Sequence, residues 1–129
     1  YYVLNNNDYG TLNNNDTLNN NDTLNNDGTL NNYYGGTLTN TGTLTNDYYL
    51  ENDGMLDNNG ILDNDFYLYN NATLINNDTL TNSDLMTNNG TLNNISGSTL
   101  HNYNMLAWAA MFDGQRSVAL RAAEGCTQS

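Results

Sequence analysis

The stretch TLNNNDTLNNNDTLNND, from Thr11 to Asp27, repeats one six-residue unit almost unchanged. Aligned on its leucine, the unit recurs seventeen times between Leu4 and Leu106, with Met86 replacing the leucine once. Every step is six residues except three steps of eight, which carry two-residue insertions. Asn stands two positions after the leucine in sixteen of the seventeen units, and Trp108 takes this place in the last. The consensus is Thr-Leu-x-Asn-x-Gly/Asp.

A period of six fits a β-strand and not a helix. On a helix, leucines six residues apart would wander around the surface, and Asn, Asp, Gly and Thr are poor helix formers. In a strand the side chains alternate with period two, so every leucine points the same way. Thr-Leu-x is therefore predicted to be a strand. Asn-x-Gly/Asp is predicted to be a turn, because these residues tolerate left-handed backbone and Asn and Asp bond their own backbone. The prediction is an all-β fold, a β-solenoid or β-helix over residues 1–104.

The number of units per coil, two or three, is left open by the repeat. Four units separate the first two insertions and ten separate the last two, and both numbers divide by two and neither by three. Two units per coil are therefore slightly favoured, on the assumption that all insertions occupy one corner. The leucines are expected to fill the interior, and the recurrent Asn is expected to form a ladder of buried side-chain amides between coils. The predicted ladder residues are Asn14, Asn20, Asn26, Asn40, Asn46, Asn52, Asn58, Asn64, Asn70, Asn76, Asn82, Asn88 and Asn94.

Residues 105–129 differ from the repeat, being rich in Ala and holding both basic residues of the chain. This segment is interpreted either as a cap on the last coil or as an assembly element. The first coil has no comparable cap, and open strand edges favour pairing with other chains. Head-to-tail assembly is therefore predicted, through Tyr1, Tyr2, Val3 and Leu4 at one end and Trp108, Met111, Phe112, Arg116 and Arg121 at the other.

Charge and composition narrow the classes of partner. The 129 residues include 14 acidic and 2 basic side chains, for a formal net charge of −12. Such a charge disfavours nucleic acid and anionic membranes as partners, and no apolar run approaches the roughly 20 residues of a membrane span. A single cysteine, Cys126, excludes an internal disulfide framework. The chain begins without Met, which suggests a processed or incomplete product.

No catalytic motif is found, and the chain is predicted not to be an enzyme. His101 is the only histidine and occupies a solvated position of the repeat, and Cys126 has no histidine close in sequence. No phosphate loop, zinc spacing or dinucleotide fingerprint occurs. No cofactor is expected. Ca²⁺ between coils is a weaker alternative, held by Asp8, Asp16 and Asp22 or by Asp57 and Asp63.

Two further surface features are noted. Four successive units carry bulky residues where Thr is usual, and these side chains would form an apolar stripe or pack under the Tyr33-Tyr34 insertion; they are Tyr49, Met55, Ile61 and Tyr67. Six Asn-x-Ser/Thr sequons are possible glycosylation sites, at Asn15, Asn21, Asn71, Asn77, Asn89 and Asn94.

The Thr-Leu-x-Asn-x-Gly repeats, over about residues 3–104, resemble those of secreted bacterial β-helical proteins of the filamentous-haemagglutinin and autotransporter-adhesin kind. They depart from hexapeptide acyltransferases, which have small aliphatic residues where this chain has Asp or Gly. The resemblance implies an extracellular or cell-surface protein. The leading hypothesis is a structural subunit of a fibre or adhesin whose partner is itself, as a homopolymer, or a glycan or host surface. The alternative is a binding module for ice or carbohydrate, through Thr rows such as Thr37-Leu38-Thr39 and Thr43-Leu44-Thr45 or through its tyrosines.

Overall fold

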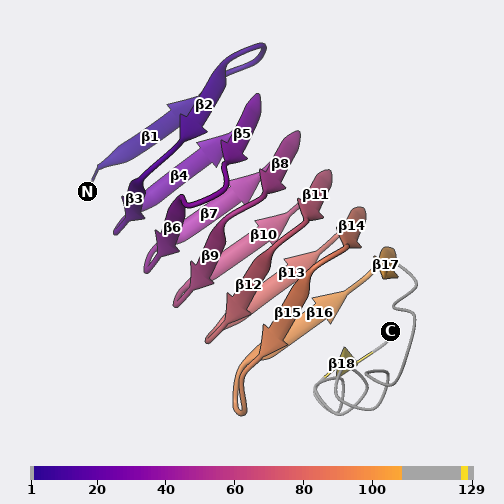
Figure 1. The fold of residues 1–129 in the computed structure, drawn as a ribbon. Coiled ribbons are helices and arrows are strands. Elements are labelled where there is room, and N and C mark those ends of the chain that lie inside the picture. Colours follow the sequence, from indigo (N-terminus) through magenta and orange to yellow (C-terminus); the bar gives the residue numbers. More distant parts are fainter. Residues whose placement is uncertain (1, 109–125, 128–129) are drawn as a thin grey trace.

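The computed structural model describes residues 2–108 and 126–127, and all regular elements in them are β-strands (Figure 1). Each repeat unit forms one four-residue strand that ends on the recurrent Asn. The strands are β1 (Val3–Asn6), β2 (Thr11–Asn14), β3 (Thr17–Asn20), β4 (Thr23–Asn26), β5 (Thr29–Asn32), β6 (Thr37–Asn40), β7 (Thr43–Asn46), β8 (Tyr49–Asn52), β9 (Met55–Asn58), β10 (Ile61–Asn64), β11 (Tyr67–Asn70), β12 (Thr73–Asn76), β13 (Thr79–Asn82), β14 (Leu85–Asn88), β15 (Thr91–Asn94), β16 (Thr99–Asn102), β17 (Met105–Trp108) and β18 (Cys126–Thr127).

Each strand from β1 to β17 pairs in parallel with the strand three units away, which makes a three-sided solenoid of about six turns. We name its faces sheet A (β1-β4-β7-β10-β13-β16-β18), sheet B (β2-β5-β8-β11-β14-β17) and sheet C (β3-β6-β9-β12-β15). The β-solenoid prediction is confirmed, and the slight preference for two units per coil is wrong. That preference assumed that all insertions share a corner. Instead, residues 7–10 lie between sheets A and B, residues 33–36 between B and C, and residues 95–98 between C and A.

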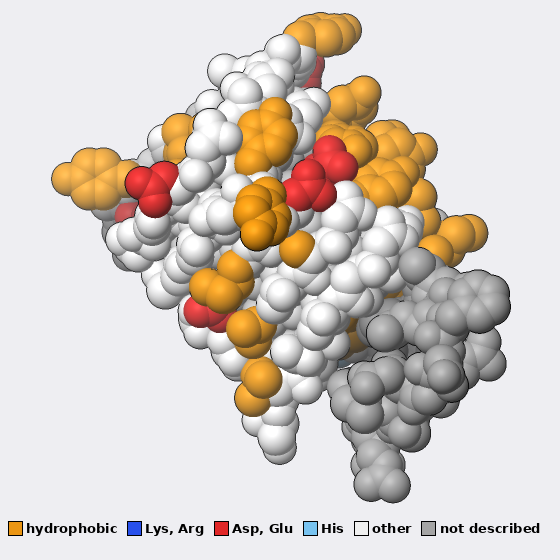
Figure 2. Space-filling view, viewed as in Figure 1, with side chains coloured by type: hydrophobic (Ala, Val, Ile, Leu, Met, Phe, Trp, Pro, Cys, Tyr) orange, Lys and Arg blue, Asp and Glu red, His pale blue; other side chains and the backbone are white. Residues whose placement is uncertain are grey.

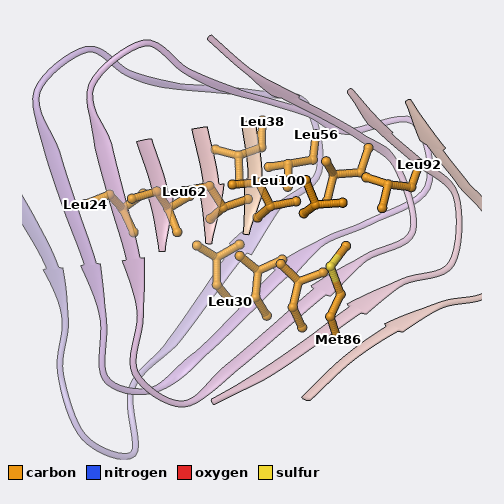
Figure 3. Close-up of a cluster of buried hydrophobic side chains, with 13 residues drawn as sticks. Leu24, Leu30, Leu38, Leu56, Leu62, Met86, Leu92 and Leu100 are labelled. Carbon is orange, nitrogen blue, oxygen red and sulfur yellow. The ribbon is translucent and has the colours of Figure 1, made fainter. Parts of the chain in front are cut away.

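The leucines form three columns inside the solenoid, one under each sheet (Figure 3). Paired strands are in register, so Leu44 lies between Leu24 and Leu62 of the neighbouring coils. Side chains from Leu24 to Met86 in these columns are fully buried, whereas Leu4 in the first coil is 43% exposed. Burial thus follows from stacking, because each leucine is covered by the coils before and after it.

The three insertions each form a hydrogen-bonded turn with one residue of positive φ, namely Tyr9 (63°), Gly35 (83°) and Gly97 (94°). In the second, the Gly36 amide donates to the Tyr33 carbonyl at 2.8 Å. Positive φ at the third residue is the mark of a type II turn. No other described residue has positive φ, so the regular corners turn without the left-handed backbone that these residue types tolerate. Glycine serves close packing there instead: a Cβ at Gly60 would collide with the carbonyl oxygen of Gly42 in the preceding coil.

The solenoid continues beyond the predicted boundary at residue 104. Strand β17 pairs with β14 from Leu85↔Met105 to Asn88↔Trp108, and β18 pairs with β16 at Leu100↔Cys126. Residues 105–108 are therefore part of the chain's own last coil. Within the described residues, no helix is long and apolar enough to cross a membrane.

Candidate functional site: the asparagine ladders and the outer faces

The recurrent Asn forms a hydrogen-bonded ladder at each of the three corners. Asn46 is fully buried, and its Nδ2 donates to Oδ1 of Asn64 in the next coil at 2.7 Å and to the Tyr67 carbonyl at 2.8 Å. Asn46 itself accepts from Asn26 at 2.7 Å. The predicted ladder is confirmed, and it includes first-coil and late members as well. The sheet A ladder is Asn6, Asn26, Asn46, Asn64, Asn82 and Asn102; the sheet B ladder is Asn14, Asn32, Asn52, Asn70 and Asn88; the sheet C ladder is Asn20, Asn40, Asn58, Asn76 and Asn94.

These ladders have a direction. In each of those bonds the donor is the Nδ2 of the coil nearer the N-terminus and the acceptor is the Oδ1 of the following coil. The first coil therefore presents acceptors at its outer edge, and the last coil presents donors. The sheet B ladder stops one coil early, because Trp108 is the register partner of Asn88. Asn88 Nδ2 donates to the Gly90 carbonyl at 3.0 Å.

The predicted assembly residues are only partly described, and those that are lie at opposite ends of the rod (Figure 1). At the first coil, Tyr2, Val3 and Leu4 are 87%, 58% and 43% exposed. Trp108 ends β17 in the last coil. The other predicted residues lie outside the described part of the chain; they are Tyr1, Met111, Phe112, Arg116 and Arg121.

The apolar stripe predicted from four successive units does not exist as one surface. Three units per coil place Tyr49 and Tyr67 on sheet B, Met55 on sheet C and Ile61 on sheet A. Sheet B carries a different column, in which Tyr49, Tyr67, Leu85 and Met105 are successive register partners. Reading every third unit of the sequence would have found this column.

Five aromatic rings gather on two neighbouring coils, on β8 and β11 of sheet B and at the corner before each strand. We call them the aromatic face: Tyr48, Tyr49, Phe66, Tyr67 and Tyr69. The rings of Tyr48 and Phe66 stack, with centroids 5.6 Å apart and an angle of 11° between their planes. The ring centroids of Phe66 and Tyr67 are 4.1 Å apart. Tyr49 and Tyr69 are 5.4 Å apart. Figure 2 shows apolar side chains clustered toward the right of the view, on the side of β8 and β11. The rings therefore pack on one another.

The alternative of packing under the Tyr33-Tyr34 insertion is not what the described residues show. Tyr34 is 93% exposed, and no ring contact joins either tyrosine to the aromatic face within residues 2–108.

Carboxylates surround the aromatic face. The Tyr49 hydroxyl donates to Glu51 Oε2 at 3.4 Å. Desolvation raises the pKa of Tyr49, and the charge of Glu51 adds to the effect. Burial is also the main cause of a raised pKa at Asp47. Its side-chain hydrogen bond with Asp27 and the charges of Asp65 and Asp27 raise this pKa further. These three aspartates follow β4, β7 and β10 at one corner, so like charges stack in successive coils.

The aspartates considered for Ca²⁺ are separated by the fold. Asp57 lies on β9 of sheet C and Asp63 on β10 of sheet A. Asp8, Asp16 and Asp22 lie at three different corners, and Asp22 accepts from the Tyr2 amide at 2.7 Å. Across residues 2–108 and 126–127, no group of three or more His, Cys, Asp and Glu side chains is arranged to hold a metal ion.

Five of the six sequons lie at exposed corners; they are Asn15, Asn21, Asn71, Asn77 and Asn89. The sixth, Asn94, belongs to the sheet C ladder and accepts from Asn76 at 2.7 Å. His101 is half-buried on sheet A and stacks on Tyr103, with centroids 6.0 Å apart.

The Thr rows considered for ice binding also fall on different faces. Thr37 and Thr39 lie on sheet C, whereas Thr43 and Thr45 lie on sheet A. On sheet A the next coil places Ile61 and Asp63 beside the latter pair. The flat, continuous array that consecutive units suggested is therefore absent from these strands.

Comparison of the chain with protein-family models, with curated proteins and with solved structures gives no significant match in any of the three. The resemblance to secreted bacterial β-helical adhesins stays a prediction from the repeat itself.

Proposed function

We propose that the chain is a structural subunit of an extracellular fibre or adhesin, a rigid rod whose first coil stacks on the last coil of another copy. The observation that carries this proposal is the common direction of the three asparagine ladders. A surface of aligned acceptors at one end and of aligned donors at the other is complementary to a second copy in one orientation.

Rigidity supports the structural role. Leucine columns and asparagine ladders join every coil to the next, and corner amides add further bonds, such as Asn59 N–H to the Asn40 carbonyl at 2.7 Å. Among the described residues, no buried side-chain nitrogen or oxygen lacks a hydrogen-bond partner. Fully satisfied polar networks of this kind stiffen a structure.

The ladders favour head-to-tail over head-to-head contact. Two first coils placed together would oppose Oδ1 to Oδ1 and leave acceptors without donors, which costs about 1–3 kcal/mol for each buried group. A last coil offers the Nδ2 groups of Asn94 and Asn102 to the acceptors of a first coil. Such a contact is heterologous, so it continues as a filament unless it closes into a ring.

The mode of docking that we propose differs from the one expected from the sequence. Residues 105–108 remain in their own coil as β17, and Trp108 gives the sheet B ladder no amide to continue. The short strand β18 occupies the edge of β16 beside Leu100 and His101. A stacking copy therefore has to displace β18 from this edge.

Electron microscopy and sedimentation velocity of the purified chain test the assembly. We expect filaments from the parent and single subunits from Leu4→Asp, since a carboxylate at the centre of the joint cannot be buried unpaired. Tyr34→Asp adds the same charge at an exposed insertion and is the matched control, which should still form filaments. A parent that remains a monodisperse monomer at high concentration would contradict the proposal. Antibody labelling of intact against permeabilised source cells tests the extracellular location separately.

A further inference from the structure

The aromatic face is not needed to build the solenoid. Strands β8 and β11 are hydrogen-bonded on both sides, and their inward positions carry the usual leucine and asparagine of the repeat. Thr29, one coil earlier in the same column as Tyr49, shows that a small polar residue is accommodated at this outward position. Five rings on two adjacent coils are therefore an addition to the fold, and Tyr48 is 50% exposed.

Within residues 2–108, no Lys or Arg neutralises the charge around these rings. Asp47 and Asp65 directly precede Tyr48 and Phe66, and Glu51 is the register partner of Tyr69. Asn71 links Glu51 to Asp53 through bonds of 3.1 and 2.9 Å. Arg116 and Arg121 are the only basic residues of the sequence, so residues 2–108 contain neither Lys nor Arg. Each half of the aromatic face thus has a carboxylate beside its rings, and no Lys or Arg among the described residues neutralises it.

We propose that the aromatic face of sheet B is a docking surface for a cationic segment of a partner protein, one that presents arginine side chains. A guanidinium stacks flat on tyrosine and phenylalanine rings through cation–π attraction and pairs at its edge with a carboxylate. The alternation of rings and carboxylates over two coils fits two such side chains. The raised pKa of Asp47 agrees with this arrangement, because an incoming cation would relieve the repulsion among Asp27, Asp47 and Asp65.

Charge distinguishes this partner from the other candidates for an aromatic surface. The net charge of −12 repels anionic ligands. A neutral oligosaccharide would stack on the rings but would leave the carboxylates uncompensated. A cationic segment would both stack on the rings and pair with the carboxylates. The negative electrostatic potential of the solenoid would also speed its association.

The test is calorimetric titration of the full chain with a ten-residue peptide of alternating Arg and Ser, at about 0.15 M salt so that distant charges are screened. The double variant Tyr48→Ser/Phe66→Ser removes two rings and keeps every charge. We expect its affinity to fall roughly five- to thirtyfold, as two exposed cation–π contacts predict. The matched control Met55→Ser/Ile61→Ser removes apolar side chains from the other two faces and should change affinity by less than about twofold. Circular dichroism checks that all variants keep the strand signal of the parent.

A second pair of variants tests the carboxylates. Asp47→Asn/Asp65→Asn should weaken binding more than Asp57→Asn/Asp63→Asn, which removes the same charge from sheets C and A. Equal losses in the two pairs, with no effect of removing the rings, would mean unspecific attraction to an acidic rod and would overturn the proposal. So would the absence of binding, or tighter binding of an uncharged cellohexaose probe than of the peptide.

Discussion

Asn58 and Asn59 are neighbours in the chain but have opposite surroundings. Asn58 is fully buried and donates to Asn76 Oδ1 at 2.8 Å and to the Thr79 carbonyl at 2.7 Å. Asn59 is exposed and accepts one bond, of 2.9 Å, from Asn77 at the surface. The repeat predicts this difference, because only the position of Asn58 is constant from unit to unit.

We expect Asn58→Leu to lower the free energy of unfolding by about 1–3 kcal/mol for each amide left unsatisfied. Asn59→Leu should change it by less than about 0.5 kcal/mol, because a solvated group finds water instead. Thermal or urea unfolding of the two variants beside the parent measures both. Indistinguishable midpoints for all three proteins would mean that the ladder does not stabilise the fold.

Tyr9 occupies a backbone position that the other two insertions give to glycine. Its φ is 63°, against 83° for Gly35, and its side chain is fully exposed. Left-handed backbone costs a residue with a Cβ roughly 1–2 kcal/mol. Gly35→Ala should therefore destabilise by about 1 kcal/mol. Tyr9→Gly should stabilise the folded state by a smaller amount, about 0.5 kcal/mol, because glycine also increases the conformational entropy of the unfolded chain. Opposite shifts of the unfolding midpoint are the expected result, and shifts of the same sign would exclude backbone strain as the cause.

Asp47 is expected to contribute more to the stability of the fold in acid than at neutral pH. Its folded-state pKa is raised above 3.8, by desolvation first and then by Asp27 and Asp65. A raised pKa means that the folded state favours the protonated form, so this stabilising contribution is full below the unfolded pKa and is lost as pH rises through the folded pKa. We expect Asp47→Asn to stabilise at pH 7 by a few tenths of a kcal/mol, as for other adjacent like charges, and the difference from the parent to vanish in acid. Melting curves of both proteins over a range of pH measure this difference in stability. If the variant is still more stable than the parent below the unfolded pKa, the raised pKa of Asp47 is not the cause.

At the scale of the strand, the repeat determines which residues face inward but not how many strands close a coil. Six is an even number, so Leu and Asn point inward in every unit whatever the coil size. The six-residue repeat length does not determine the geometry of the corners. It depends on close approach between coils, as at Gly60, and on insertions that happen to occupy three different corners. For the same reason the ladder could be predicted, whereas the aromatic face could not, since Tyr49 and Tyr67 become neighbours only when three units form a coil.

The insertions should be removable as units. Deleting Tyr34 and Gly35 leaves Asn-Tyr-Gly-Thr-Leu, which matches the regular corner of the repeat. We expect this variant to keep the strand signal in circular dichroism and to melt within a few degrees of the parent. Deleting Leu44 and Thr45 removes the same number of residues from β7 and should abolish cooperative melting, because it takes a core leucine and shifts the strand against both neighbours. Unfolding of the first variant would show that the insertion stabilises its corner.

At the scale of the whole molecule, all three ladders run in the same direction, although the sheet B ladder ends one coil early, at Asn88. Parallel strands already give a solenoid two different ends, and the asparagine amides add a chemical direction, with acceptors at Asn6, Asn14 and Asn20 and donors at Asn94 and Asn102. The proposed assembly would use these ends of the repeat, once β18 has left the edge of β16. The aromatic face lies on the side of the rod, so a filament would repeat it along its length and could bind a multivalent partner with increased avidity.

Removal of residues 109–129 separates two roles of the C-terminal segment. Strand β18 lies on the edge of β16 in its own subunit, so part of this segment covers the surface that a second copy would need. The truncated chain keeps β17 and hence every coil of the solenoid, and we expect it to remain folded with a cooperative thermal transition. It should also assemble more readily than the parent, with longer filaments in electron micrographs and a lower concentration for their onset, because the β16 edge no longer has to be cleared. If the truncated chain instead loses its filaments and sediments as a single subunit, residues 109–129 are themselves the contact with the neighbouring copy, as the sequence first suggested.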